Sequence, residues 1–252
     1  MTRPIHPPTV FLTGASSGLG EALARHYAAQ GAVLGLISRR PVTVSNGASY
    51  PLDVTDEAAM ARVARDFIDR FGVPDLVIAN AGISSGTSGA DGGDVAKLRK
   101  VLEVNVAGLA ATLAAFAPAM REAGRGTLAG IASVAGFRGL AGNGAYCASK
   151  SAAITWLEAL RTELYGSGVS VVCVCPGYID TPMTRVNRFR MPFLISADDA
   201  ARRIARAIEG KRRLAVIPWQ MALVSLLLRA MPGWLFDRIA SRAPRKPRDV
   251  AV

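Results

Sequence analysis

Tyr146 and Lys150 are the residues whose types and spacing point most directly to chemistry. They lie four apart at the start of a segment with a helical pattern, so their side chains project from one face of the predicted helix. A tyrosine with the ordinary pKa of about 10 is a poor acid–base catalyst near neutral pH. A neighbouring ammonium favours the phenolate and lowers that pKa. The pair is therefore a candidate proton-transfer device, although the same spacing is also typical of a solvated helix face.

A glycine-rich turn supplies a second candidate site. It follows an apolar run at 9–13 and opens a helix predicted for 18–30, and its glycines are spaced Gly-x-x-x-Gly-x-Gly. Such a turn lets a pyrophosphate approach the backbone at the N-terminus of a helix. The sequence therefore predicts a dinucleotide site formed by Thr13, Gly14, Ser16, Ser17, Gly18, Leu19 and Gly20.

The second predicted strand ends in Ser38, Arg39 and Arg40. A carboxylate near this point would accept hydrogen bonds from the adenosine ribose and repel a 2′-phosphate. No carboxylate is present, and two guanidinium groups can pair with a phosphate. We therefore expect NADP(H) to be favoured over NAD(H). The alternative is that both arginines lie on the surface beside a site that uses NAD.

The elements that must position these residues alternate between strand and helix. Strands are predicted at 9–13, 33–38, a short stretch ending at Leu52, 76–79, 127–132, 170–175 and 214–217. Helices are predicted at 18–30, 55–71 (capped by Thr55), 94–123 and 146–165. Continuous hydrophobicity in the strands indicates burial on both faces, as in a parallel sheet. We expect an α/β fold with a doubly wound, mainly seven-stranded parallel sheet between two helical layers, the Rossmann fold.

The chain of 252 residues is predicted to form a single domain. Its core would span 9–217, a helical extension 218–241 and a disordered basic tail 242–252. Only about a dozen residues separate the second and third strands, and Pro41, Asn46 and Gly47 disfavour a helix there. We expect a loop or a single turn at that crossover.

Composition limits the classes of function. The net charge is +11, mostly from arginines late in the chain. These could attract nucleic acid, anionic lipid or a phosphorylated ligand, but solvated helix faces explain them more simply, and no aromatic residues interleave them as nucleic-acid binding requires. The three cysteines have no disulfide or metal spacing. No secretory signal or membrane-spanning helix is expected, so we predict a cytoplasmic protein with no metal and no nucleic-acid partner.

Several further motifs occur in the order typical of one family. They are Asp53-Val54, Asn80-Ala81-Gly82, Asn105, Ser133 thirteen positions before Tyr146, Pro176-Gly177, and Thr181. With the glycine turn and the Tyr-x-x-x-Lys pair, they make residues 9–217 resemble the short-chain dehydrogenase/reductase family in its single-domain form. The resemblance implies an NAD(P)-dependent oxidoreductase that interconverts a carbonyl and an alcohol, commonly as a homodimer or homotetramer.

The resemblance also implies roles for individual residues. Tyr146 would be the acid in reduction and the base in oxidation, Lys150 would bind the nicotinamide ribose and lower the tyrosine pKa, and Ser133 would hydrogen-bond the substrate oxygen. Asn105 would hold a water of a proton relay, or alternatively satisfy an irregular helix. The implied cofactor contacts continue through Asp53, Val54, Asn80, Ala81, Gly82, Pro176, Gly177, Ile179 and Thr181.

The substrate pocket is predicted from loops near the nicotinamide. Its candidates are mainly apolar, which suggests an apolar carbonyl or alcohol: Ser133, Phe137, Leu140, Tyr146, Tyr178 and Met183, with Ile83, Phe189 and Met191 near them. Residues 183–196 are expected to form a mobile lid, with an ordinary surface loop as the alternative.

The very apolar extension could cover the pocket, join a subunit interface, or lie on a membrane surface with the basic tail near anionic lipid. Two rival functions remain at this stage. One is a cofactor-binding sensor or scaffold without turnover, and the other is a membrane-surface reductase of lipid-derived carbonyls.

Overall fold

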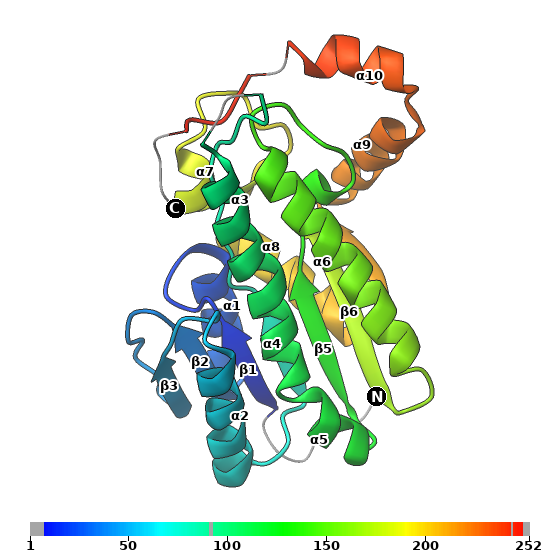
Figure 1. Cartoon of the computed structure of the whole chain (residues 1–252). Helices are drawn as coiled ribbons and strands as arrows, with labels where there is room; N and C mark the ends of the chain where they lie inside the picture. The colour runs from blue at the N-terminus through cyan, green and yellow to red at the C-terminus, as the bar shows by residue number, and fades with distance from the viewer. Residues whose placement is uncertain (1–7, 91–92, 243, 249–252) are drawn as a thin grey trace.

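The computed structural model describes residues 8–90, 93–242 and 244–248 (Figure 1). Its central sheet has seven parallel strands in the order β3-β2-β1-β4-β5-β6-β9, which confirms the predicted fold class. The strands are β1 (Thr9–Thr13), β2 (Val33–Ser38), β3 (Gly47–Pro51), β4 (Leu76–Ala79), β5 (Gly126–Ile131), β6 (Val169–Pro176) and β9 (Leu214–Ile217).

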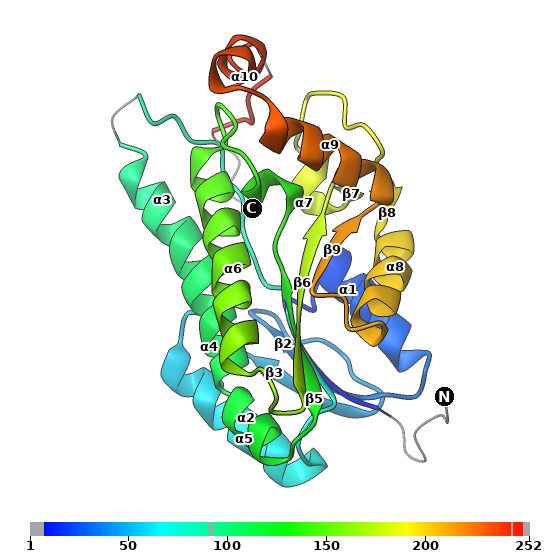
Figure 2. The ribbon, with the colours of Figure 1, turned by 90° about the vertical axis from the view of Figure 1, so that its right-hand side faces the viewer.

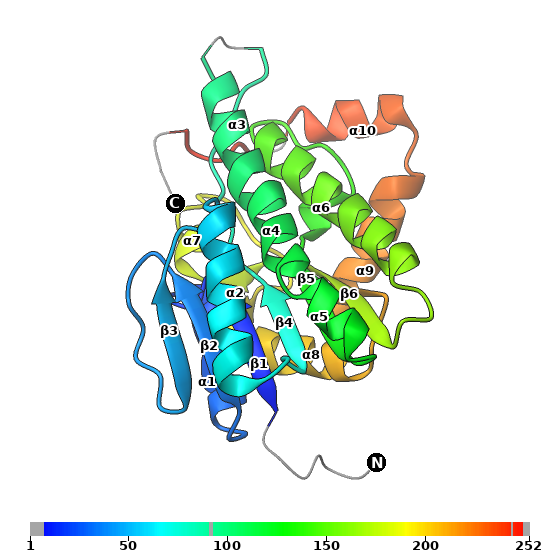
Figure 3. The same cartoon turned by 60° about the horizontal axis from the view of Figure 1, so that its bottom comes forward.

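Helices cover both faces of the sheet (Figures 2 and 3). On one face α1 (Gly18–Ala28) packs against α8 (Ala197–Glu209). On the other lie α2 (Glu57–Phe71), α4 (Gly108–Ala114) and α6 (Gly144–Glu163). Each face has its own buried hydrophobic cluster, and strands β1 and β4 are buried along their whole length. Burial on both faces explains why these strands read as continuous apolar runs rather than alternating ones.

The short crossover between β2 and β3 contains no helix, as predicted. Its loop is held by hydrogen bonds from Val42 N to Ser49 Oγ (3.1 Å) and from Asn46 Nδ2 to Ala32 O (3.4 Å). The carboxyl end of β2 is therefore bordered by a loop where this fold type usually places a helix.

The prediction of one long helix over 94–123 is wrong. The segment consists of α3 (Val95–Leu102), a π-helical turn at Glu103–Ala107, α4, and α5 (Ala117–Glu122). The π turn carries Asn105, whose buried amide bonds the backbone of Ile83 instead of facing solvent. Pro118 lies in the first turn of α5 and disfavours a helical conformation just before it. The cap of α2 was also misplaced, since Asp56 and not Thr55 accepts from the Ala59 amide (2.8 Å).

The predicted helical extension is present as α9 (Trp219–Ala230) and α10 (Gly233–Ala240). Both begin directly after a proline, Pro218 and Pro232, a position that needs no backbone N–H. Ahead of the extension, the small parallel pair β7 (Ile179–Asp180) and β8 (Ile195–Ser196) encloses α7 (Pro182–Arg185). No helix in the described part of the chain is long and apolar enough to cross a bilayer.

Part of the basic tail, residues 244–248, makes contacts with the fold, while residues 243 and 249–252 lie outside the described part, and the disorder expected for 242–252 stays a prediction. Lys246 Nζ donates to Ser84 Oγ (2.8 Å), and Arg248 pairs with Asp94 (3.0 Å). The backbone of Lys246 lies so close to Gly86 that a Cβ there would be 2.5 Å from Lys246 O. These partners lie more than 150 residues away in sequence, so a basic run that looks solvated on its own is anchored by the fold.

Candidate active site

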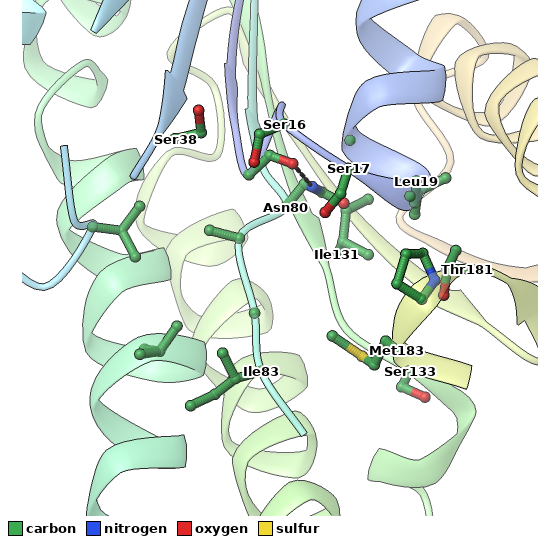
Figure 4. Close-up of a pocket in the computed structure, with 18 of the residues that line it drawn as sticks. Ser16, Ser17, Leu19, Ser38, Asn80, Ile83, Ile131, Ser133, Thr181 and Met183 are labelled. Atoms are coloured by element: carbon green, nitrogen blue, oxygen red, sulfur yellow. Dashed lines mark hydrogen bonds between the residues drawn. The ribbon is translucent and has the colours of Figure 1, made fainter. Parts of the chain in front are cut away.

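A cavity of about 770 Å³ opens where the strands end. The residues of its wall come from the segments that follow the six strands β1 to β6. The chain adds β2 and β3 on one side of β1 and β4, β5 and β6 on the other, so the boundary between β1 and β4 is the switch point of the sheet. Open α/β sheets bind ligands at this switch point. Figure 4 shows Ser16, Ser17 and Asn80 around one end of the cavity, with Ile83, Ser133 and Met183 toward the other.

The glycine turn after β1 fits a dinucleotide pyrophosphate. Gly14 and Gly18 have φ angles of +73° and +58°, which L side chains rarely adopt. At Gly20 a Cβ would lie 2.0 Å from Gly14 O, so only glycine allows α1 to start this close to the turn. Ser17 at the N-cap makes no side-chain capping bond. The first-turn amides of α1 therefore remain available to an anion beside the cavity.

Asn80 holds the turn against the end of β4. Its side chain donates to Thr13 O (3.0 Å) and Gly14 O (3.4 Å), the second of which is the dashed line in Figure 4. The Thr13 hydroxyl accepts from the backbone N–H groups of Asn80 and Ala81, both at 3.1 Å. Thr13 does not line the cavity. Its role is to fix the end of β4 against the start of the glycine turn.

At the β2 end the cavity is bordered by Ser38, Arg39, Arg40 and Asp53. Both guanidinium side chains are exposed, and the Ser38 hydroxyl donates to the Arg40 carbonyl. Burial favours a higher pKa for Asp53, but hydrogen bonds from Thr55 outweigh it and the pKa lies below its usual value. The positive charges of Lys100 and Arg39 act in the same direction.

Lys100 is a cavity residue that the sequence interpretation missed. It lies one helical turn before Val104, which also lines the cavity. Val104 directly precedes the motif residue Asn105, and this spacing was the available signal. Lys100 is thus a third exposed cation of the cavity wall, in addition to Arg39 and Arg40.

Ser133, Tyr146 and Lys150 meet at the other end of the cavity. Ser133 lies two residues after the end of β5 and caps a short 3-10 turn, where its hydroxyl accepts from Ala135 N (3.2 Å). Tyr146 and Lys150 come from the first two turns of α6, with Lys150 Nζ 5.7 Å from the Tyr146 ring centre. Three side chains from two elements thus border one volume with a hydroxyl, a phenol and an amine.

The pKa of Tyr146 is not lowered here, contrary to expectation. Burial raises it to about 12, and the neighbouring Ser133 hydroxyl opposes that rise. Burial also lowers the pKa of Lys150 to about 8, and its ammonium donates to Ile131 O (2.8 Å). Removal from water is the main cause of both shifts, and a phenol with this pKa is protonated at neutral pH.

Asn105 lies behind the cavity and is fully buried. Its Oδ1 accepts from Ile83 N (2.8 Å), while Nδ2 donates to Ile83 O and to Ser149 Oγ, both at 2.9 Å. These bonds connect the π turn, the loop after β4 and helix α6. They correspond to the alternative considered for Asn105, an amide that satisfies an irregular helix.

The structure brings most of the predicted cofactor contacts together on the cavity wall. Of the predicted substrate residues, Ser133, Tyr146 and Met183 line it, whereas Phe137, Leu140 and Tyr178 do not. Phe137 lies under the Arg229 guanidinium (5.7 Å), and Tyr178 packs edge-on against Phe189 (6.3 Å). Among the described residues, no three His, Cys, Asp or Glu side chains form a group that could hold a metal ion.

A sheet of this order with a glycine turn at its switch point defines a dinucleotide-binding protein of the Rossmann type. The chain belongs to the short chain dehydrogenase family, whose sequence profile matches residues 8–191. It is therefore an oxidoreductase of that family.

Similar proteins extend over nearly the whole chain. An uncharacterized oxidoreductase of Myxococcus xanthus is 39% identical and covers 93% of this chain and 96% of its own. A ketoacyl reductase of a Nostoc species is 32% identical over 87% and 83% of the two chains. A short chain dehydrogenase from Burkholderia cenocepacia, solved in complex with NADP, superposes with a TM-score of 0.83 at 27% identity and covers 96% and 100%.

Proposed function

We propose that this protein is an NADP(H)-preferring short-chain dehydrogenase/reductase that interconverts an apolar ketone or aldehyde and its alcohol. The observation that carries the proposal is the meeting of Ser133, Tyr146 and Lys150 at the end of the cavity remote from Arg39 and Arg40. A cofactor lying along the wall with its pyrophosphate at the glycine turn would have its reactive end near these three side chains.

The chain's own residues would hold the cofactor in a fixed direction. The α1 amides and Gly14, Gly18 and Gly20 receive the pyrophosphate, while residues after β2 and β3 receive the adenosine. Near the other end, Pro176, Gly177, Ile179 and Thr181 border the cavity and would fix the orientation of the nicotinamide. When bound, the nicotinamide supplies or accepts the hydride.

The protein would supply the proton and the hydrogen bonds. A phenol with a pKa of about 12 is protonated at neutral pH, which suits Tyr146 to donate a proton to the oxygen of a carbonyl during reduction. The Ser133 hydroxyl would donate to the same oxygen and stabilise the developing negative charge. Lys150 would approach the cofactor ribose and stabilise the phenolate that remains. Asn105 would keep the Ile83 loop and α6 in register as a positioning residue, and its proposed water relay stays a prediction.

Two observations support the preference for NADP(H) and an apolar carbonyl. Arg39 and Arg40 border the cavity at the end of β2, where a 2′-phosphate would lie, and no carboxylate follows them in the loop 39–46. Toward the other end, the described residues of the wall include Ile83, Ile131 and Met183 and no carboxylate that could receive a cationic substrate. The name of the Nostoc relative, a ketoacyl reductase, is consistent with a carbonyl group as the reacting centre.

The test is a carbonyl and alcohol panel assayed with NADPH and NADH, beside the variant Tyr146→Phe. We expect turnover of an apolar carbonyl with NADPH and a loss of about 100-fold to 10,000-fold in kcat for Tyr146→Phe, as is usual for removal of a general acid. Tyr178→Phe is the matched control, because Tyr178 lies outside the cavity wall.

Cofactor binding, followed by NADPH fluorescence, should survive the Tyr146→Phe change. If Tyr146→Phe keeps wild-type turnover, the proposed mechanism is wrong. If NADPH binds but no compound of the panel turns over, the rival function of a binding-only sensor or scaffold replaces the proposed one.

A further inference from the structure

Helix α9 presents its apolar side to the solvent. Trp219, Leu223, Leu226 and Leu227 follow helical spacing on one side of the helix, and each is between 60% and 67% exposed. The opposite side is the one that packs on the protein, through the buried residues Met221 and Ser225. An amphipathic helix on a globular core normally has the reverse arrangement, with polar residues outward.

Helix α10 follows α9 at the same end of the molecule (Figures 1 and 2) and also exposes a large aromatic side chain. Trp234 is 70% exposed, while Phe236 on the opposite side of α10 is buried. We call Trp219, Leu223, Leu226, Leu227 and Trp234 the outer apolar face. Soluble monomers rarely expose so many large apolar side chains together, so the surface calls for a partner.

The charges around the outer apolar face define the kind of partner. Residues 219–242 contain three arginines, Arg229, Arg238 and Arg242, and one carboxylate, Asp237. All four are exposed, and in the described part of the chain none of them forms an ion pair. A partner that accepts leucine and tryptophan in its interior and carries negative charge at its surface would match both features.

An anionic lipid surface has these properties. Leucine side chains enter the boundary between head groups and acyl chains, tryptophan is favoured at that boundary, and arginine is attracted to anionic head groups. We propose that the outer apolar face of α9 and α10 binds the protein peripherally to an anionic membrane surface.

A second copy of the chain fits the charges less well. Two-fold pairing through the same face would bring three arginines of each copy to the rim of the contact, with one carboxylate per chain to offset them. The described chain itself does not cover the face, because its own packing uses the opposite sides of both helices. The proposal is independent of the reaction and can succeed or fail without it.

The outer apolar face lies close to the catalytic cavity, because α9 separates the two. Met221, on the inner side of α9, packs on Gly177, where an added Cβ would lie 2.6 Å from Met221 Cγ. Gly177 lines the cavity. A membrane bound at the outer side of α9 would therefore lie one helix thickness from the catalytic cavity, which is a favourable place for an enzyme whose apolar substrate is dissolved in lipid.

The experiment is co-sedimentation of the full-length chain with vesicles of phosphatidylcholine alone and of phosphatidylcholine mixed with phosphatidylglycerol. Binding is expected for the anionic vesicles, weaker at high salt because screening reduces the attraction of the arginines. The double variant Leu223→Ser/Leu226→Ser should reduce the partition by about tenfold or more, since it removes two apolar side chains from the lipid. Arg238→Gln should reduce it by about fivefold.

Tyr165→Ala is the matched control, because Tyr165 is a highly exposed aromatic residue just beyond the far end of α6. Its binding should equal that of the wild type. All substituted side chains point to solvent, and circular dichroism verifies that the variants remain folded.

Three results would overturn the proposal. The first is no sedimentation with anionic vesicles at low salt, and the second is an equal loss of binding in the Tyr165→Ala control. The third is a dimer, found by light scattering, that Leu223→Ser/Leu226→Ser dissociates while the wild type does not bind vesicles. That last result would assign the face to a second copy of the chain.

Discussion

The amine of Lys150 is almost completely buried in the cavity wall. Its side chain is 4% exposed and donates to the Ile131 carbonyl, and among the described residues it forms no ion pair with a carboxylate. The charged form is therefore unfavourable in the folded protein, as its low pKa shows. A group that is costly for folding and lies in the cavity wall is typical of residues retained for function rather than stability.

Replacing Lys150 by methionine is expected to stabilise the protein and abolish turnover. The pKa falls from 10.5 to about 8 on folding, so below pH 8 the ammonium lowers the free energy of unfolding. The variant Lys150→Met removes this cost, and we expect a gain on the order of 1–3 kcal/mol at neutral pH. Urea unfolding and a turnover assay measure the two effects.

The pH dependence serves as the internal control. Because the folded pKa is depressed, the unfolded wild-type chain binds more protons between about pH 8 and 10.5, and stability should rise there with pH. The advantage of Lys150→Met should shrink over the same window. A variant less stable than the wild type at pH 7 would contradict this account of Lys150.

Arg39 and Arg40 are the residues expected to recognise the 2′-phosphate. The double variant Arg39→Gln/Arg40→Gln should lower kcat/KM for NADPH by about 10-fold to 100-fold, the usual effect of losing charge-assisted hydrogen bonds. The value for NADH should change little. Steady-state kinetics with both cofactors gives the ratio, and Arg62→Gln, on α2 and outside the cavity wall, is the control.

An unchanged NADPH to NADH ratio in the double variant would show that these arginines are surface residues. Lys100, which also lines the cavity and acts on Asp53, would then be the next candidate for the phosphate contact.

At the scale of elements, the extension is fastened to the loop that follows Ser133. Arg138 Nη1 donates to Leu228 O (2.8 Å), in the last turn of α9, and to Met231 O (2.9 Å), just after it, and its guanidinium lies 4.2 Å from the Phe236 ring centre. One side chain thus caps α9 and holds α10. The sequence offered no signal for this role, because an arginine in a glycine-rich loop has many possible partners.

Replacing Arg138 by alanine should loosen α9 and α10 while the sheet remains intact. The carbonyls at the end of α9 would lose their charged donor, and Phe236 would lose its cation contact. Hydrogen exchange should accelerate by about tenfold or more in 226–240 and stay unchanged in β1 and β4. Arg238→Ala is the control on α10, since Arg238 makes no hydrogen bond through its side chain in the described chain. Equal hydrogen exchange in the wild type and in Arg138→Ala would contradict the proposed role of Arg138 in holding α9 and α10 to the loop after Ser133.

The elements also show what a sequence can and cannot predict. The glycine turn and the Tyr146–Lys150 pair could be predicted because short spacing and strand–helix order define them locally, whereas Ser133 was predicted only from the family resemblance. The irregular helix at Asn105 was foreseen only as an alternative, because the hydrogen bonds that its side chain makes with Ile83 join segments far apart in the sequence. The raised pKa of Tyr146 was missed for a similar reason, since the extent of burial follows from packing and not from spacing.

At the scale of the whole molecule, two separate surfaces expose apolar side chains. The first is the outer apolar face of the extension. The second is the outer side of the π turn, α4 and α6, where exposed small residues such as Ala107 and Ala114 accompany Trp156, which is 46% exposed. A flat helical layer with one large aromatic residue is well suited to pair with itself.

We therefore predict a homo-oligomer formed through the α4 and α6 layer. The variant Trp156→Glu would place two like charges near the two-fold axis and should shift the protein toward monomers by at least about tenfold in dissociation constant. Light scattering over a range of protein concentrations measures this shift. Leu223→Ser is the control at the other surface. An oligomer unaffected by Trp156→Glu, or a wild type that is monomeric throughout, would contradict the prediction.

The close contact between the tail and two distant glycines has a consequence for engineering. A Cβ at Gly86 would lie 2.5 Å from Lys246 O, and one at Gly142 would lie 2.7 Å from the Arg245 side chain. Both glycines belong to loops beside the start of α6, the loops that a library for new substrates would randomise first. Such a library should keep residues 244–248 and these glycines as one unit, or vary them together. A tag fused directly after the tail would act on the same loops and belongs at the other terminus.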